Sequence, residues 1–100
     1  MSSGPEVLLD SEHVRVRIMT LNARQATAWH YHTEVTDQML CLEGRVAVEC
    51  RSPQERFELI NGQHCKVEVD RVHRVVNLTD EIAKYLLVQG VGQYDFKEVE

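Results

Sequence analysis

The chain has 100 residues, enough for one hydrophobic core and too few for two, so we expect a single domain with one site. Its formal net charge is -5, which leaves no broad basic surface for phosphate backbones, and we expect no nucleic-acid partner. No apolar run reaches the length of a membrane span, and residues 1–5 lack the basic and apolar regions of a signal peptide. We therefore expect a cytoplasmic protein with no membrane partner.

Alternation of apolar and polar residues recurs along the chain, whereas no stretch has apolar residues at helical spacing over three turns. Segments 14–18, 46–50 and 65–69 carry valine, isoleucine or cysteine at every second position. Each predicts a half-buried strand with its apolar face on the core. Short strands at roughly ten-residue spacing, separated by turn residues, predict an all-β sandwich or barrel.

The sharpest turn signal is the pair Asn61-Gly62. It is typical of a type I′ hairpin turn, because both central positions of that turn need positive φ and asparagine and glycine tolerate it best. We therefore expect a tight reversal of the chain here.

The cysteines Cys41, Cys50 and Cys65 are odd in number and unclustered. This spacing argues against a disulfide framework or a structural zinc knot, so we expect free thiols that pack as small apolar residues. Cys41 could also coordinate a soft ion or serve redox chemistry, but core packing is favoured.

His30 and His32 are separated by one residue in the run from Trp29 to His32. On a strand, residues i and i+2 point to the same face, so the two imidazoles project together while Trp29 and Tyr31 point the other way. Two imidazoles on one face can share a metal ion. Such a pair can also be two hydrogen-bonded interior histidines, and the pair alone does not decide between these alternatives.

Residues 24–44 resemble the first sequence motif of the cupin family. In that motif, His-x-His is followed after three or four residues by an acidic residue and after six more by glycine. Here the spacing is His32-x4-Asp37-x6-Gly44, with aspartate where the family has glutamate. Arg24 stands where the family usually has glycine before the histidine pair.

Residues 62–77 resemble the second cupin motif, Gly-x5-Pro-x-Gly-x2-His-x3-Asn. It is matched in spacing by Gly62, Glu68, Asp70, His73 and Asn77. Glu68 replaces the proline and Asp70 the second glycine, a substitution that a turn accepts because aspartate tolerates turn conformations.

The resemblance implies an all-β fold, the cupin double-stranded β-helix or jelly-roll barrel, as one domain over residues 1–100. It implies that His30, His32, Asp37 and His73 converge inside the barrel as ligands of one divalent metal ion, which this donor set restricts to Fe, Mn, Ni or Zn. On a six-coordinate ion, four protein ligands leave two positions open. Small cupins commonly dimerise, and the outward Trp29 and Tyr31 suit a homodimer interface.

The carboxylate ligand has two candidates, Asp37 and Glu34. Glu34 would share the face of the histidine pair only if their strand continued past His32. We expect residues 33–36 to contain a reversal instead, because both strands must line one interior. Glu34 then lies at the rim, and Asp37 is favoured as the ligand.

Other polar residues are weighed against surface roles. Arg15, Arg17, Tyr85 and Gln89 could orient a polar substrate if their faces line the mouth of the barrel, but surface pairing is favoured. His13 and His64 lie in phase with polar neighbours, so we expect both to be solvated.

Two classes of function remain open. The site could belong to a metal-dependent enzyme acting on a small polar organic molecule, as a dioxygenase or as an isomerase, cyclase or lyase. It could also belong to a non-catalytic module that binds or senses a small ligand, because one fold hosts many functions. We favour the enzyme, although no general base with a partner stands out beyond the ligands.

Overall fold

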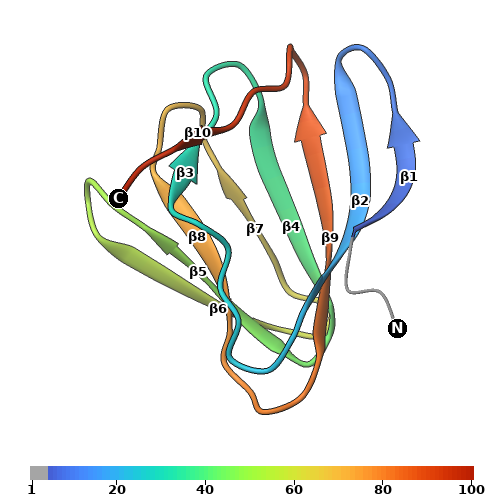
Figure 1. Ribbon diagram of the computed structural model, residues 1–100, viewed down its shortest axis with the longest axis vertical. Helices are drawn as coiled ribbons and strands as arrows, with labels where there is room; N and C mark the ends of the chain where they lie inside the picture. Colours follow the sequence, from blue (N-terminus) through green and yellow to red (C-terminus); the bar gives the residue numbers. More distant parts are fainter. Residues whose placement is uncertain (1–4) are drawn as a thin grey trace.

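The computed structural model describes residues 5–100, which form two five-stranded antiparallel sheets that face each other (Figure 1). One sheet has the order β1 (Glu6–Asp10), β2 (Val14–Leu21), β9 (Ala83–Gly90), β4 (Thr36–Glu43) and β7 (His64–Val67). The other has the order β10 (Lys97–Glu98), β3 (His30–Tyr31), β8 (His73–Asn77), β5 (Arg45–Cys50) and β6 (Glu55–Ile60). The predicted all-β fold is confirmed.

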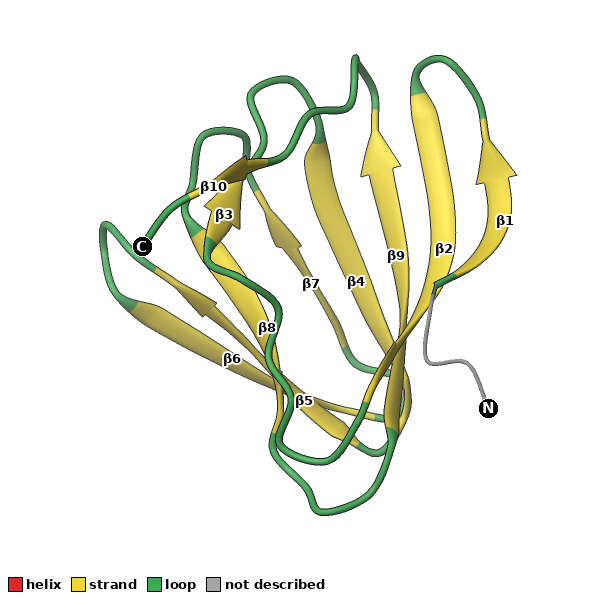
Figure 2. Ribbon diagram, in the orientation of Figure 1, coloured by secondary structure: helices red, strands yellow, loops and turns green. Residues whose placement is uncertain are grey.

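Loops and turns join the strands directly (Figure 2). Within residues 5–100, no helix is long and apolar enough to span a membrane. Residues 1–4, on which the expectation of no signal peptide partly rests, lie outside the described part of the chain.

The core lies between the two sheets and follows the strict alternation of β4, β8 and β9. Met39 and Cys41 are buried on the face of β4 that carries Asp37, and Val75 and Asn77 are buried on the face of β8 that carries His73. This parity was expected from the sequence, and it turns the polar site residues into an otherwise apolar interior.

Strand β2 departs from the expectation. Val14, Val16 and Ile18 were expected to face the core and the arginines between them to be paired at the surface. Arg17 instead lines an interior cavity together with Met19, and Arg17 pairs across the ladder with Leu87 of β9, which also lines that cavity. The inward face of β2 is thus partly polar, because it borders the site rather than the hydrophobic core.

The turn at Asn61-Gly62 is also not the type I′ hairpin that was expected. Gly62 has φ +89° whereas Asn61 is not among the residues with positive φ, and the Gln63 amide donates to the Ile60 carbonyl at 2.9 Å. One positive φ at the third position is typical of a type II turn. The turn connects β6 and β7, which belong to different sheets, so the chain crosses from one sheet to the other.

Two departures from the cupin motifs keep the backbone conformation of glycine. Arg24 and Asp70 stand where glycine is usual, and their φ values are +60° and +63°. The Asp70 amide donates to the carbonyl of His32 at 2.7 Å, which ties the turn before His73 to the histidine pair. Both residues therefore adopt the left-handed backbone conformation that glycine adopts most easily.

Gly44 and Gly62 give a matched test of how closely the loops are packed. A Cβ at Gly44 (φ +78°) would lie 3.2 Å from Ala83 Cβ and 3.3 Å from the Ile82 carbonyl oxygen, whereas a Cβ at Gly62 would meet nothing within 4 Å. We expect Gly44→Ala to lower the free energy of unfolding by about 2 kcal/mol and Gly62→Ala by about 1 kcal/mol, measured by urea denaturation. Equal losses would contradict the close packing of Gly44 on Ala83.

Candidate metal centre

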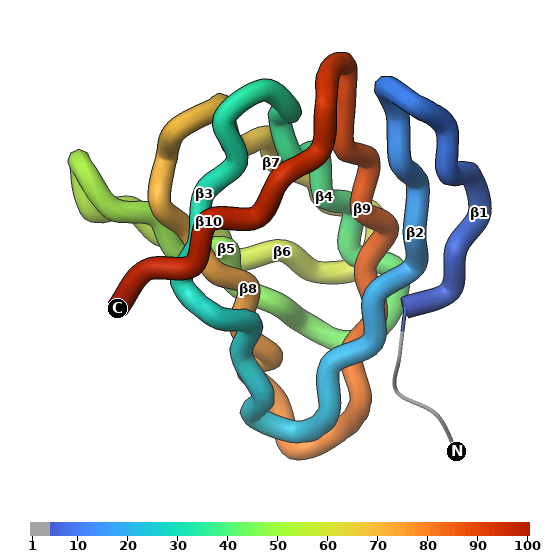
Figure 3. Tube along the Cα trace, turned by 45° about the horizontal axis from the view of Figure 1, so that its top comes forward, coloured from blue at the N-terminus to red at the C-terminus, as the bar shows by residue number. Residues whose placement is uncertain are grey.

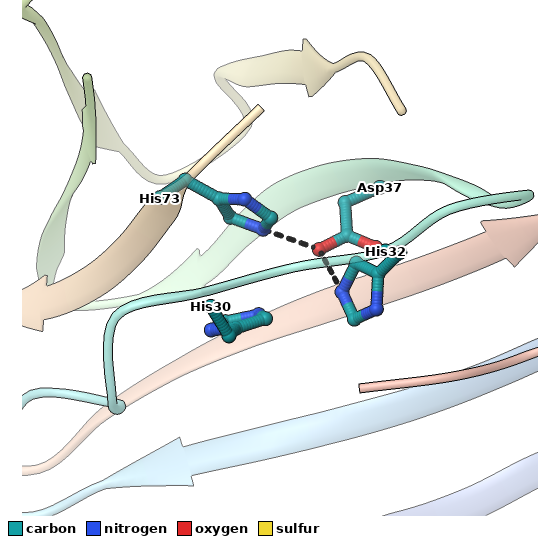
Figure 4. A group of neighbouring side chains, drawn as sticks. All are labelled: His30, His32, Asp37 and His73. Atoms are coloured by element: carbon teal, nitrogen blue, oxygen red, sulfur yellow. Dashed lines mark hydrogen bonds and ion pairs between the residues drawn. The ribbon is translucent and has the colours of Figure 1, made fainter. Parts of the chain in front are cut away.

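Four buried side chains from both sheets meet at one end of the barrel (Figure 4). His30 of β3 lies directly opposite His73 of β8 in the second sheet, and Asp37 of β4 faces them from the first sheet. His32 follows β3 and completes the group. One potential ligand atom from each residue lies within 4.8 Å of the others, so the four could hold a metal ion.

Main-chain carbonyl groups orient all three imidazoles. The Nδ1 atoms of His30, His32 and His73 lie 2.7, 2.5 and 2.8 Å from the carbonyl oxygens of Ala28, Asp95 and Arg71. A carbonyl oxygen can only accept, so each Nδ1 must donate. In the neutral ring this leaves the Nε2 lone pair free for a metal ion, an arrangement found in most metal-binding histidines.

Asp37 lies against the Nε2 atoms of two of these rings. Its Oδ2 atom is 2.8 Å from His73 Nε2 and 3.2 Å from His32 Nε2, the two contacts drawn in Figure 4. Its Oδ1 atom accepts a hydrogen bond of 3.0 Å from Gln89, its cross-strand neighbour on β9. With neutral rings, Oδ2 would face lone pairs at short range, so these contacts need a positive charge between them, either protons or a metal ion.

Two opposing effects, burial and the charge of neighbouring groups, set the pKa values of three of these side chains. Burial lowers the pKa of His30 to about 4, which keeps this ring neutral and available as a ligand. Burial also lowers the pKa of His32, but the hydrogen bond and charge of Asp37 outweigh it and the net direction is upward. Burial would raise the pKa of Asp37, yet hydrogen bonds from His32 and His73 hold it below its usual range, so the carboxylate is charged.

The alternative ligands lie outside the cluster. Glu34 is exposed in the loop between β3 and β4, where its carboxylate accepts from the Gln93 amide at 3.4 Å. The loop between β3 and β4 reverses the chain as expected, but it carries the chain from one sheet to the other, so the two strands face each other across the interior and do not lie side by side (Figure 1). Cys41 packs in the core, and His13 and His64 are exposed, as expected.

Sequence reasoning missed the C-terminal segment, which crosses from β9 in one sheet to β10 in the other (Figure 3). The Phe96 ring stacks on His30 with 4.3 Å between ring centroids, and the Tyr94 ring lies 5.6 Å from His32. The Asp95 carboxylate accepts from the amide and hydroxyl of Thr33. The spacing of Tyr94 and Phe96 two residues apart was the only signal, and it gave no indication of what the rings contact.

A cavity of about 80 Å³ opens beside the cluster. Its lining includes His30, His32 and Asp37 together with three residues that were weighed for substrate binding, namely Arg17, Tyr85 and Gln89. Arg15 is not in the lining, but it does not match the surface pairing that was expected: its side chain is only 17% exposed and its guanidinium lies over the ring of Tyr94, a lining residue, although it also lies 3.8 Å from Asp10. The volume holds several water molecules or a ligand of a few non-hydrogen atoms, well below the size of a drug-sized pocket.

No protein-family model matches the sequence, and no curated protein matches it. Solved structures do match. A Klebsiella pneumoniae protein with a double-stranded β-helix domain is 20% identical, with a TM-score of 0.84 over 100% of this chain and 83% of that one. The chain has the double-stranded β-helix fold of the cupins.

Two further structures with the cupin-like fold carry an activity in their names. A sugar phosphate isomerase of the cupin superfamily from Silicibacter pomeroyi is 18% identical, with a TM-score of 0.69 over 86% of this chain and 68% of that one. An oxalate oxidase is 11% identical, with a TM-score of 0.81 over 99% of this chain and 57% of that one. At these identities the comparison shows the fold, and the two different activities confirm that the fold alone does not assign one.

Replacing each of the two candidate carboxylate ligands by alanine tests the cluster directly. We expect Asp37→Ala to weaken binding of a divalent metal ion by about 10-fold or more, because a ligand is lost, and Glu34→Ala to leave it within a few-fold of wild type. Titration of the metal-free proteins followed by calorimetry measures both. The opposite order would move the carboxylate ligand to Glu34.

Proposed function

We propose that this chain is a metal-dependent cupin enzyme that acts on a small polar organic molecule. The observation that carries the proposal is the orientation of the three rings. Each Nδ1 atom is held by a main-chain carbonyl, which leaves Nε2 as the free ligand atom of each ring, and one potential ligand atom from each of the four buried residues lies within 4.8 Å of the others. Four converging acceptors are costly to bury unless a cation joins them.

The donor set suits Fe(II), Mn(II), Ni(II) or Zn(II), since imidazole and carboxylate together favour first-row divalent ions. Such an ion would act as a Lewis acid on an oxygen of the substrate, in a dioxygenase or in an isomerase, cyclase or lyase. The protein's own residues would hold the ion, orient the ligand and restrict water. Gln89 fixes Asp37 through a 3.0 Å hydrogen bond, and Tyr94 and Phe96 cover the histidine pair.

A non-catalytic ligand-binding or sensing module is the second candidate. The small cavity, about 80 Å³, favours this candidate. So does the cluster, because all four of its titratable groups would bind the ion and none would be left to transfer protons. A binding module would retain metal and bind a ligand but turn nothing over.

The deciding experiment compares metal content and turnover in one set of proteins. The metal in the purified wild type is identified by elemental analysis, and oxygen uptake and product formation are then measured with thiols, diketones and sugar acids. We expect His73→Ala to lower metal affinity by about 10-fold or more and to abolish turnover, since one of four ligands is lost.

His64→Ala is the matched control, because His64 is exposed on β7 and outside the cluster. We expect it to behave as wild type. Full metal occupancy in His73→Ala would contradict the proposed site. Metal-loaded wild type that binds small ligands without turnover would favour the non-catalytic module.

We also propose that the chain forms a homodimer through the face that carries Trp29 and Tyr31. Both rings are half-buried, and the guanidinium groups of Arg51 and Arg74 lie 4.0 and 4.7 Å from the Trp29 ring centroid. Aromatic and arginine side chains together are typical of interface centres. Light scattering at micromolar concentration should give a dimer mass that Trp29→Ala reduces, and a monomeric wild type would refute the dimer.

A further inference from the structure

Among the described residues, Arg17 is the one arginine that lines the cavity beside the cluster, and its guanidinium has no carboxylate partner. The Nε atom is shielded from solvent and has no hydrogen-bond partner among the described residues; the other such atom there is Nη1 of Arg15, whose guanidinium lies over the Tyr94 ring. No ion pair of Arg17 occurs within 4.0 Å in residues 5–100, whereas Arg24, Arg71 and Arg74 each have one and Arg56 has two. A shielded and unpaired charged donor is uncommon in native proteins, because its lost hydration is not replaced.

The aromatic ring nearest to Arg17 does not supply the missing partner. The Cζ atom of Arg17 is 5.9 Å from the Tyr94 ring centroid, at the outer limit of a cation–π contact. Arg15 occupies the ring face instead, with its Cζ atom 3.5 Å from the same centroid. The guanidinium of Arg17 therefore keeps its donors available toward the cavity.

The cavity that Arg17 lines is the one beside the four-residue cluster. Asp37 is the only carboxylate in its lining, and that carboxylate is already engaged by His32, His73 and Gln89. With a divalent ion on the cluster, the cavity would hold two positive centres and one committed negative charge. This excess of positive charge favours an anion that contacts both the Arg17 guanidinium and the metal ion.

We propose that the ligand of this cavity is a small carboxylic acid, whose carboxylate pairs with Arg17 while a neighbouring hydroxyl, oxo or carboxylate oxygen approaches the metal cluster. The planar guanidinium matches a carboxylate through two parallel hydrogen bonds. The cavity volume of about 80 Å³ favours a ligand of a few non-hydrogen atoms. This inference rests on the proposed function, because it assigns the substrate class of the same site.

The test uses calorimetry on the full chain, loaded with the divalent ion that it retains, with glycolate and oxalate as probes and the neutral glycolamide as their control. Glycolamide keeps the hydroxyl group and lacks the negative charge. We expect wild type to bind glycolate more tightly than glycolamide. Arg17→Gln should weaken glycolate binding by roughly 10- to 100-fold, the loss expected for a charge-assisted pair, and leave glycolamide binding and metal content unchanged.

Two further variants distinguish the charge of Arg17 from the planar shape of its guanidinium, and both from the general effect of removing an arginine. Arg17→Lys keeps the charge without the planar fork, so we expect intermediate affinity, and it also serves if Arg17→Gln fails to fold. Arg56→Gln is the matched control, because Arg56 is exposed on β6 and pairs with Glu49 at 3.6 Å outside the cavity. It should bind glycolate as wild type does.

The outcomes distinguish this inference from the proposed function. If metal binds and glycolate affinity does not depend on Arg17, or if neither glycolate nor oxalate binds at millimolar concentration, the carboxylate assignment is overturned. If no metal binds, the proposed function fails, and the same titration on metal-free protein still decides whether Arg17 binds a carboxylate. Stronger binding of inorganic phosphate than of either carboxylate would also overturn the assignment.

Discussion

The structure depends on one electrostatic constraint, the burial of four acceptor groups that point at one another. Asp37 Oδ2 lies 2.8 Å from His73 Nε2 and 3.2 Å from His32 Nε2, and the Nδ1 atom of each histidine is committed to a carbonyl. Such a group is stable only with positive charge at its centre. A divalent ion at the centre would supply that charge. The remaining architecture holds the four groups at this distance.

Three separate parts of the fold hold the cluster. The antiparallel register places His30 opposite His73 in one sheet and Asp37 opposite Gln89 in the other. The turn at Asp70 is bonded to the His32 carbonyl at 2.7 Å, and the C-terminal segment supplies the Asp95 carbonyl that orients the His32 ring. These restraints come from both sheets and from a segment far along the chain. The cluster therefore has this geometry only when the two sheets and the C-terminal segment are packed together.

Alternation along the chain predicted the all-β fold, and the resemblance of residues 24–44 and 62–77 to the two cupin motifs implied the residues of the cluster. Asp37 was preferred over Glu34 because a reversal of the chain within residues 33–36 would leave Glu34 at the rim, and Glu34 does lie exposed in that loop. The inward turn of Arg17 could not be predicted, because an alternating strand next to a polar cavity looks the same as one with a solvated polar face. The contacts of Tyr94 and Phe96 depend on where the last strand docks, which no local pattern records.

The most direct test of the account is the identity of the atoms around a bound ion. Crystals of the metal-loaded chain, with anomalous diffraction measured at the absorption edge of the ion, would locate it independently of any assumed ligands. The account predicts one ion bound by Nε2 of His30, His32 and His73 and by the Asp37 carboxylate, at distances of about 2.0–2.2 Å for a first-row divalent ion. An ion held elsewhere, or no anomalous signal within the cluster of a protein saturated with metal, would contradict it.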